Sequence, residues 1–250
     1  MNKYVLIITN PGEEKTQGYC EGVNVDLKNY KEYFCSPLGG AWKNEEIISL
    51  TKPSVDELKL TLNKLKSIEY LVTIFCGHGY YCSKRESTIL ELKKGYEFDS
   101  IDLRIGVKKQ LTILDCCRKV YPIMLSDSYE FAKAASKNYI KFNINDCRKL
   151  YEESIYNCSN SIVVLHSCNI NEVAGDDGVK GGYYSSSLIK VAKNWADDQN
   201  INTLSNHRIR SVVDIHDNSL PMVSRLSNKT QNPQIEKPRT ESHFPFAIIA

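Results

Sequence analysis

The chain has 250 residues, 42% hydrophobic and 25% charged, with a formal net charge of +2. This balance is ordinary for a globular protein and indicates neither a nucleic acid nor a membrane surface as the main partner. No apolar run approaches the roughly 18–20 residues that span a bilayer, and the N-terminal segment does not resemble a secretory leader. Nine cysteines in a chain without a recognisable secretory leader predict a cytoplasmic protein with reduced thiols.

The first half of the chain alternates between strand and helix patterns. Short apolar runs predict strands at 3–9, 46–50 and 70–76. Apolar residues at helical spacing predict helices over 23–34 and 55–65. A Ser-x-x-Glu capping box, with Ser54 and Glu57, precedes the second helix, and Asp26 is expected in the first turn of the first.

The middle of the chain combines a hairpin, a strand and a basic segment. Residues 87–98 alternate and turn at Lys94-Gly95, which predicts a surface hairpin, and a brief helix is expected near 99–109. Residues 111–117 predict a fourth buried strand. Residues 118–160 are polar and basic and are expected to be partly helical.

The last third adds strands at 161–167 and 244–249, a helix over 184–195 and an ambiguous stretch at 200–240. Strands that alternate with helices predict an α/β protein with a mainly parallel, six-stranded sheet covered on both faces. In such sheets, ligands bind beyond the carboxyl ends of the strands.

Two of these strand ends carry chemically active residues. His78 stands between Gly77 and Gly79 after the third strand, and the fourth strand ends in Asp115-Cys116-Cys117. A cysteine thiolate is a strong nucleophile, and a nearby histidine can hold it ionised or move its proton. Because side chains alternate along a strand, only one of the two cysteines is expected to be functional.

The two segments resemble a known family. "IFCGHG" (74–79) is similar to the Ser-Gly-His-Gly segment of metacaspases, with Cys76 in place of the serine, and "LDCCR" (114–118) resembles their Asp-x-Cys segment. The stretches 22–34 and 181–190 also look like the family's first helix and the border of its cleft. The chain therefore resembles bacterial caspase-like C14 cysteine peptidases over nearly its whole length.

This resemblance implies a caspase-like three-layer sandwich and a catalytic dyad. His78 falls on the family's histidine and Cys117 on its nucleophile, with an oxyanion hole from the backbone N–H groups of Gly79 and Cys117. Asp115 and Asp26 fall on the acids of a pocket that favours arginine or lysine before the cleaved bond. A carboxylate pair suits a guanidinium.

The resemblance also implies an organisation and a role. Residues 1–117 match a large-subunit-like part, 118–160 the linker, with basic residues as candidate autoprocessing sites, and 161–250 a small-subunit-like part of one domain (1–250). No cofactor is implied, although calcium activation occurs in the family. The expected partner is a protein substrate, such as a pore-forming effector encoded nearby, in bacterial defence or regulated cell death.

Two other functions stay open at this stage. Cys76, His78, Cys82 and the pair Cys116/Cys117 suggest a zinc cluster, but their spacing does not match common zinc sites and adjacent cysteines are poor ligands for one ion. The other alternative is a non-catalytic caspase-like scaffold that acts by binding. Asp26 also has a purely structural explanation, as a carboxylate that stabilises its helix N-terminus.

Overall fold

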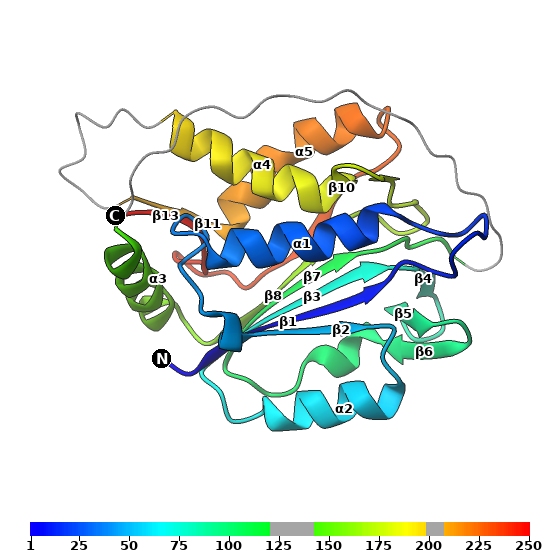
Figure 1. Cartoon of the computed structure of the whole chain (residues 1–250), viewed down its shortest axis with the longest axis horizontal. Helices are drawn as coiled ribbons and strands as arrows, with labels where there is room; N and C mark the ends of the chain where they lie inside the picture. Colours follow the sequence, from blue (N-terminus) through cyan, green and yellow to red (C-terminus); the bar gives the residue numbers. More distant parts are fainter. Residues whose placement is uncertain (121–142, 199–207) are drawn as a thin grey trace.

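The computed structural model describes residues 1–120, 143–198 and 208–250. In these residues a central six-stranded sheet has the order β12-β8-β7-β3-β1-β2 (Figure 1). Its strands are β1 (Lys3–Asn10), β2 (Ile47–Thr51), β3 (Tyr70–Gly77), β7 (Lys109–Asp115), β8 (Ser161–His166) and β12 (Gln234–Glu236). Only the β12–β8 pairing is antiparallel, so the predicted mainly parallel sheet is confirmed.

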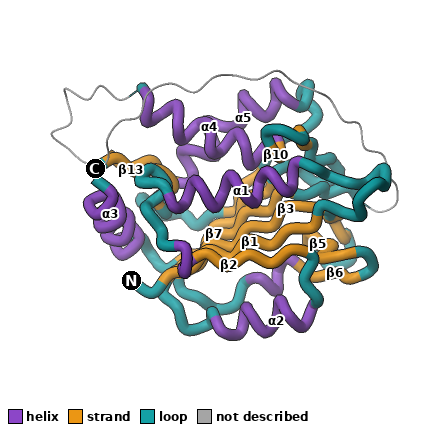
Figure 2. The backbone as a smooth tube through the Cα atoms, in the orientation of Figure 1, coloured by secondary structure: helices purple, strands orange, loops and turns teal. Residues whose placement is uncertain are grey.

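Helices cover one face of this sheet, as Figure 2 shows. They are α1 (Gly22–Cys35), α3 (Ile144–Asn157), α4 (Tyr183–Asp197) and α5 (Val212–Leu226). Alternate strand residues such as Val5, Ile74 and Ile113 point to this side and form one core with the helices. We call it the α1/α4 side.

The opposite face is covered by α2 (Val55–Lys64) and by a small antiparallel sheet. That sheet consists of β4 (Gly79–Cys82), β5 (Ser87–Lys93) and β6 (Tyr96–Asp99), and a 3-10 helix η2 (Ser100–Leu103) follows. The intervening strand residues, among them Leu6, Phe75 and Leu114, form a second core on this α2 side. The three layers predicted from the family resemblance are therefore present.

Several local predictions are confirmed with small shifts. Ser54 caps α2, because its side chain accepts a hydrogen bond from the Glu57 N–H at 3.1 Å. The predicted hairpin turns at Lys94-Gly95, between β5 and β6. The brief helix near 99–109 is only the 3-10 helix η2, and the fourth strand ends at Asp115 rather than Cys117.

The prediction for residues 244–249 is correct as a strand but wrong as the sixth strand of the central sheet. They form β13 (Pro245–Ile249), which pairs with β11 (Arg208–Ser211) in a separate two-stranded sheet. The sixth position belongs to β12, which pairs with the edge of β8. The remaining short strands, β9 (Asp176–Asp177) and β10 (Gly181–Gly182), pair with each other beside the N-terminus of α4.

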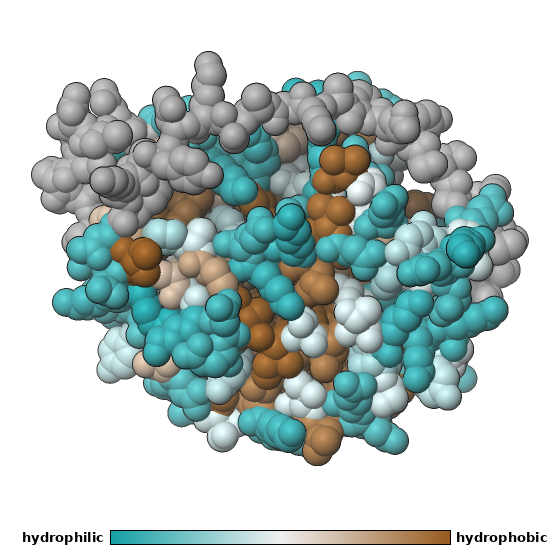
Figure 3. Space-filling view, in the orientation of Figure 1, coloured by the Kyte–Doolittle hydropathy of each residue, from teal (hydrophilic) through white to brown (hydrophobic). Residues whose placement is uncertain are grey.

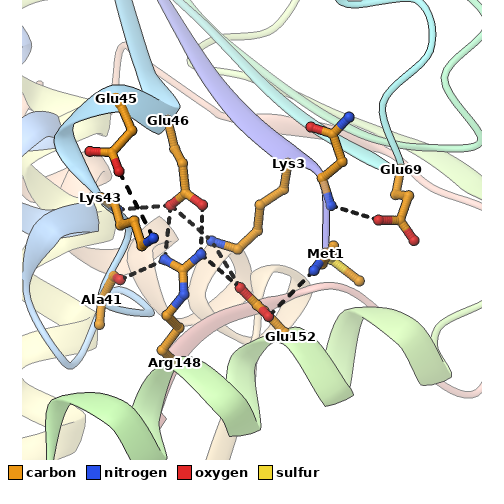
Figure 4. Close-up of polar contacts among 10 residues, drawn as sticks. Met1, Lys3, Ala41, Lys43, Glu45, Glu46, Glu69, Arg148 and Glu152 are labelled. Carbon is orange, nitrogen blue, oxygen red and sulfur yellow. Dashed lines mark hydrogen bonds and ion pairs between the residues drawn. The ribbon is translucent and has the colours of Figure 1, made fainter.

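Within 118–160, residues 121–142 lie outside the described part, and α3 confirms helix in the rest. A charged cluster attaches α3 to the amino-terminal ends of β1 and β2 (Figure 4). Arg148 donates hydrogen bonds to both Glu46 oxygens, at 2.5 and 2.9 Å, and its guanidinium lies 3.0 Å from Glu152. Lys3 Nζ lies 3.4 Å from Glu46 and 3.6 Å from Glu152, and 3.7 Å from the Trp42 ring centre. Burial lowers the pKa of Lys3 to about 8, against the opposing effect of Glu46.

The surface seen in Figure 3 is largely hydrophilic, and its hydrophobic residues run from top to bottom through the middle of the view, past the level at which Figure 1 places β2. This strand is the open edge of the sheet, and its side chains are only half-buried. No helix in the described residues is both long and apolar enough to cross a membrane.

Candidate active site

The ends of β3 and β7 place His78 and Cys117 at the same edge of the sheet. The parallel register pairs Cys76 with Asp115, and His78 and Cys117 each lie two residues beyond this pair. Farther on, the Tyr81 N–H donates to the Lys119 carbonyl at 2.9 Å. The two segments therefore stay together past both candidate residues.

The two glycines around His78 stand where neighbouring atoms leave no space for a side chain. Gly77 has φ of 150° and packs against the Asn10 carbonyl, where a side chain would clash. A Cβ on Gly79 would lie 2.9 Å from both the Cys116 sulfur and the Ile89 carbonyl oxygen. The motif thus lets the histidine loop pass tightly between β1 and the end of β7.

The two adjacent cysteines have different environments. Leu111, Ile113 and Asp115 point to the same face of the sheet, the α1/α4 side, where the Asp115 carboxylate accepts a hydrogen bond from α4. Cys116 points the other way and packs in the core of the α2 side. Cys116 is 1% exposed. Cys117 is partly exposed. Cys116 is thus buried and Cys117 partly exposed, and both lie just beyond the strand.

Cys117 is in its protonated form in this arrangement. Its Sγ donates to the Ala174 carbonyl at 3.8 Å. Burial raises the pKa of the Cys117 thiol, and the charges of Asp115 and Asp176 raise it further. A base that accepts the thiol proton is therefore needed before this sulfur acts as a nucleophile.

His78 lies among the other groups that surround Cys117. Its Nε2 is 3.9 Å from the Cys20 sulfur. The carboxyl of Asp176 is close enough for the His78 charge to lower its pKa, although burial raises that pKa overall. Among the described residues, the hydrogen bonds of the His78 ring and the Cys117 thiol go to Cys20 and Ala174 rather than to each other.

Asp26 and Asp115 meet at the N-terminus of α4. The Gly182 N–H donates to both oxygens of Asp26 at 3.0 Å, and the Ser185 N–H donates to Asp115 at 3.0 Å. The Ser185 hydroxyl also donates to Asp115, at 2.6 Å, and accepts from Tyr30. The carboxylates thus bind N–H groups that a helix N-terminus leaves unpaired.

The structural explanation of Asp26 as a charge on its own helix is wrong. Helix α1 has no acidic residue in its first turn, and Asp26 is 1% exposed, inside the fold. Burial raises its pKa, and the neighbouring Asp115 raises it further. The pKa of Asp115 is also raised, mainly by burial. A buried acid pair of this kind favours either a shared proton or an added cation.

The zinc cluster suggested from the sequence does not form. Cys76 packs on the α1/α4 side, 3.9 Å from the Ser185 hydroxyl, while Cys116 packs on the α2 side. Within residues 1–120, 143–198 and 208–250, no group of three or more His, Cys, Asp or Glu side chains is arranged to hold a metal ion.

Three residues of the site were missed by the sequence analysis. Ser185 lies in the stretch 181–190 that drew attention, but nothing in the pattern singled it out. Cys20 lies in an irregular segment and Asp176 in the two-residue strand β9, both without a motif, and only the fold brings them to His78. An isolated cysteine or aspartate in a loop carries no signal of its partners.

The comparison with protein families agrees with this geometry. The model of the caspase domain, peptidase family C14, matches residues 2–244. No curated protein matches the chain. Because the match covers nearly all of the chain and the sheet has the expected layers, the chain belongs to the caspase-domain family of C14 cysteine peptidases.

Proposed function

We propose that the protein is a cysteine endopeptidase with Cys117 as nucleophile and His78 as general acid/base. The observation that carries this proposal is the β3–β7 register, which sets both residues two positions beyond a paired position at one edge of the sheet. Cys117 is also the partly exposed member of the cysteine pair.

In the proposed reaction, His78 takes the Cys117 proton and the thiolate attacks the carbonyl carbon of the scissile peptide bond. The backbone N–H groups of Gly79 and Cys117 would stabilise the oxyanion. The C–N bond breaks as His78 returns the proton to the departing amine, which leaves an acyl-enzyme. Water, deprotonated by His78, then hydrolyses the thioester and restores the thiol.

Catalysis requires a rearrangement from the observed state. The Cys117 thiol must leave Ala174, and the His78 ring must turn from Cys20 toward the substrate. Catalytic hydrogen bonds are often formed only in the substrate complex, so this geometry is compatible with the proposal. The segment that carries Ala174 then acts as a cover over the nucleophile.

For the substrate we propose a preference for arginine or lysine before the cleaved bond. The support is the buried pair Asp26 and Asp115, whose pKa values are both raised above the usual range of a carboxyl group. A guanidinium or ammonium group would relieve the repulsion between them, whereas an aspartate side chain would add a third negative charge.

The test compares Cys117→Ala with Cys116→Ala on a fluorogenic peptide and with an irreversible thiol-directed peptide probe. Cys117→Ala is expected to lose turnover and labelling, while Cys116→Ala keeps both. Circular dichroism checks that each variant is folded. Labelling retained in Cys117→Ala and lost in folded Cys116→Ala would place the nucleophile one residue earlier.

The same probe distinguishes the peptidase from a non-catalytic scaffold, because a scaffold leaves the folded protein unlabelled. A cytoplasmic location stays a prediction from the cysteine content, whereas bacterial defence or regulated cell death and a pore-forming substrate stay predictions of the family resemblance. So does the division into 1–117, 118–160 and 161–250. Of the basic residues considered for autoprocessing, Arg148 and Lys149 lie inside α3, and Arg148 is bonded to Glu46.

A further inference from the structure

A cavity lies on the α2 side of the sheet, and neither His78 nor Cys117 lines it. It has a volume of about 210 Å³ and is bounded by the ends of β7 and β8, by β5 and by η2. Hydroxyl groups of Ser87, Thr88, Ser100 and Thr112 are among its lining groups. Arg104, Arg118 and His166 also line it, so it combines hydrogen-bond donors with positive charge.

Arg118 is the central group of this cavity. The side chain is buried, with the residue 7% exposed. Its Nε donates to the Thr88 hydroxyl at 3.1 Å and its Nη1 to the Cys168 carbonyl at 3.3 Å, and the guanidinium lies 5.5 Å from the Tyr81 ring centre. No carboxylate of the described residues forms an ion pair with it, although a buried guanidinium normally requires a counter-ion.

The acid closest to the cations that line the cavity, Glu236, already has two partners. Glu236 accepts from Arg104 at 2.6 Å and lies 2.8 Å from the His166 Nε2. The other acid of the lining, Glu86, is exposed at the rim. The Nδ1 atom of His166 is buried without a hydrogen-bond partner. Among the described residues, the walls therefore keep one buried cation without a carboxylate partner and one unsatisfied polar atom.

We propose that this cavity binds a small oxyanion, a phosphoryl or carboxylate group held by the guanidinium of Arg118. The planar guanidinium and the surrounding hydroxyls match the geometry of oxygen acceptors. Binding would supply the missing counter-ion and would stabilise the folded state.

Arg118 directly follows Cys117, and its backbone N–H donates to the Glu172 carbonyl at 3.0 Å, two residues before Ala174. The bound anion would therefore fix the segment that carries the nucleophile. This second step rests on the proposed function, whereas the binding itself does not.

The test is isothermal titration of the full chain with inorganic phosphate and, separately, with acetate, against chloride at the same ionic strength. We expect saturable 1:1 binding of at least one anion. Phosphate alone assigns a phosphoryl ligand, acetate alone a carboxylate, and both a general oxyanion site. Arg118→Gln is expected to weaken binding roughly ten- to hundredfold.

Arg104→Gln is the second variant, because Arg104 is partly exposed and its loss is not expected to prevent folding; weaker binding is expected here too. Arg85→Gln is the matched control, since Arg85 is nearby and exposed but does not line the cavity. The absence of anion-specific binding, or equal affinity in Arg104→Gln, Arg85→Gln and the parent protein, overturns the proposal. Cys117→Ala should bind as the parent does, which separates this result from the test of the peptidase.

Discussion

Cys116 and Cys117 are neighbours in the sequence, but their side chains lie in different environments. Cys116 lies in an apolar core with a pKa well above the usual range, so it stays a thiol, while Cys117 is partly exposed. The neighbouring Asp115 faces α4. At the scale of the residue, three consecutive positions therefore face different surroundings: an acid bonded to α4, a buried thiol and the proposed nucleophile.

The acid pair gives the first prediction at this scale. Asp115→Asn keeps the shape and removes the charge, so cleavage after arginine or lysine should fall by roughly ten- to hundredfold, the effect of one charge-assisted contact. Cleavage after leucine should fall much less. A peptide-library profile of both proteins measures this. A parent protein that cleaves mainly after aspartate or an uncharged residue would contradict the acidic pocket but leave the dyad untouched.

Gly79 gives the second prediction. Its α carbon faces the Cys116 sulfur and the Ile89 carbonyl, which leave no space for a methyl group. Gly79→Ala should therefore destabilise the fold by about 1–3 kcal/mol and displace His78. Gly18→Ala is the control, because a Cβ there meets only the His78 ring, at 4.0 Å. Equal midpoints for the two variants in urea unfolding would show that the loop relaxes freely.

At the scale of the element, α3 is attached to the sheet by its charges. Burial alone would raise the pKa of Glu46, but hydrogen bonds from Arg148 and the Lys43 N–H, together with the charge of Lys3, lower it to about 2. The folded state therefore favours ionised Glu46 more than the unfolded chain does. This contribution is complete above the usual pKa of about 4.5 and is lost as the pH falls toward 2.

The third prediction follows from the lowered pKa of Glu46. Glu46→Gln should lower the free energy of unfolding near neutral pH by roughly 1–3 kcal/mol, and the difference from the parent should shrink as the pH falls from about 4.5 to 2. Urea unfolding at a series of pH values measures it. Glu153→Gln is the control, since that side chain is exposed and its ion-pair partner is Lys149, at 3.9 Å. A constant difference across this pH range would show that the charge of Glu46 is not the cause.

Strands and helices could be predicted from the sequence where the local hydrophobic pattern matches the burial of the side chains in the folded protein. The runs that became β1, β3, β7 and β8 are buried on both faces and therefore continuously apolar. In contrast, α5 contains Pro221 and begins with two valines, and β12 has only three residues. Tertiary pairing defines these two elements, so the stretch 200–240 stayed ambiguous.

At the scale of the whole molecule, the sequence predicted that the ends of β3 and β7 lie at one edge of the sheet, but not what surrounds them. The order of motifs and strands placed His78 and Cys117 at one edge. The contacts of His78 with Cys20, of Cys117 with Ala174 and of Asp115 with Ser185 join residues that lie 58, 57 and 70 positions apart along the chain. Local patterns hold no information about such pairs.

The last prediction concerns how the two parts of the chain hold together. Residues 1–120 and 143–250 are joined by the parallel pairing of β7 with β8. Tyr33 also donates to the Phe246 carbonyl at 2.9 Å, Asp26 accepts from Gly182, and Arg148 bonds to Glu46. None of these contacts involves residues 121–142.

Fragments 1–120 and 143–250 produced together should therefore form a soluble 1:1 complex that reacts with the thiol-directed probe. Size-exclusion chromatography and mass spectrometry measure assembly, and the probe measures the site. Tyr33→Phe is a mild control that keeps the ring packing, whereas Asp26→Ala should weaken assembly because it leaves the Gly182 N–H buried without an acceptor. Fragments that stay apart or aggregate would show that the connecting segment is required for folding, and would contradict the division into two subunit-like parts.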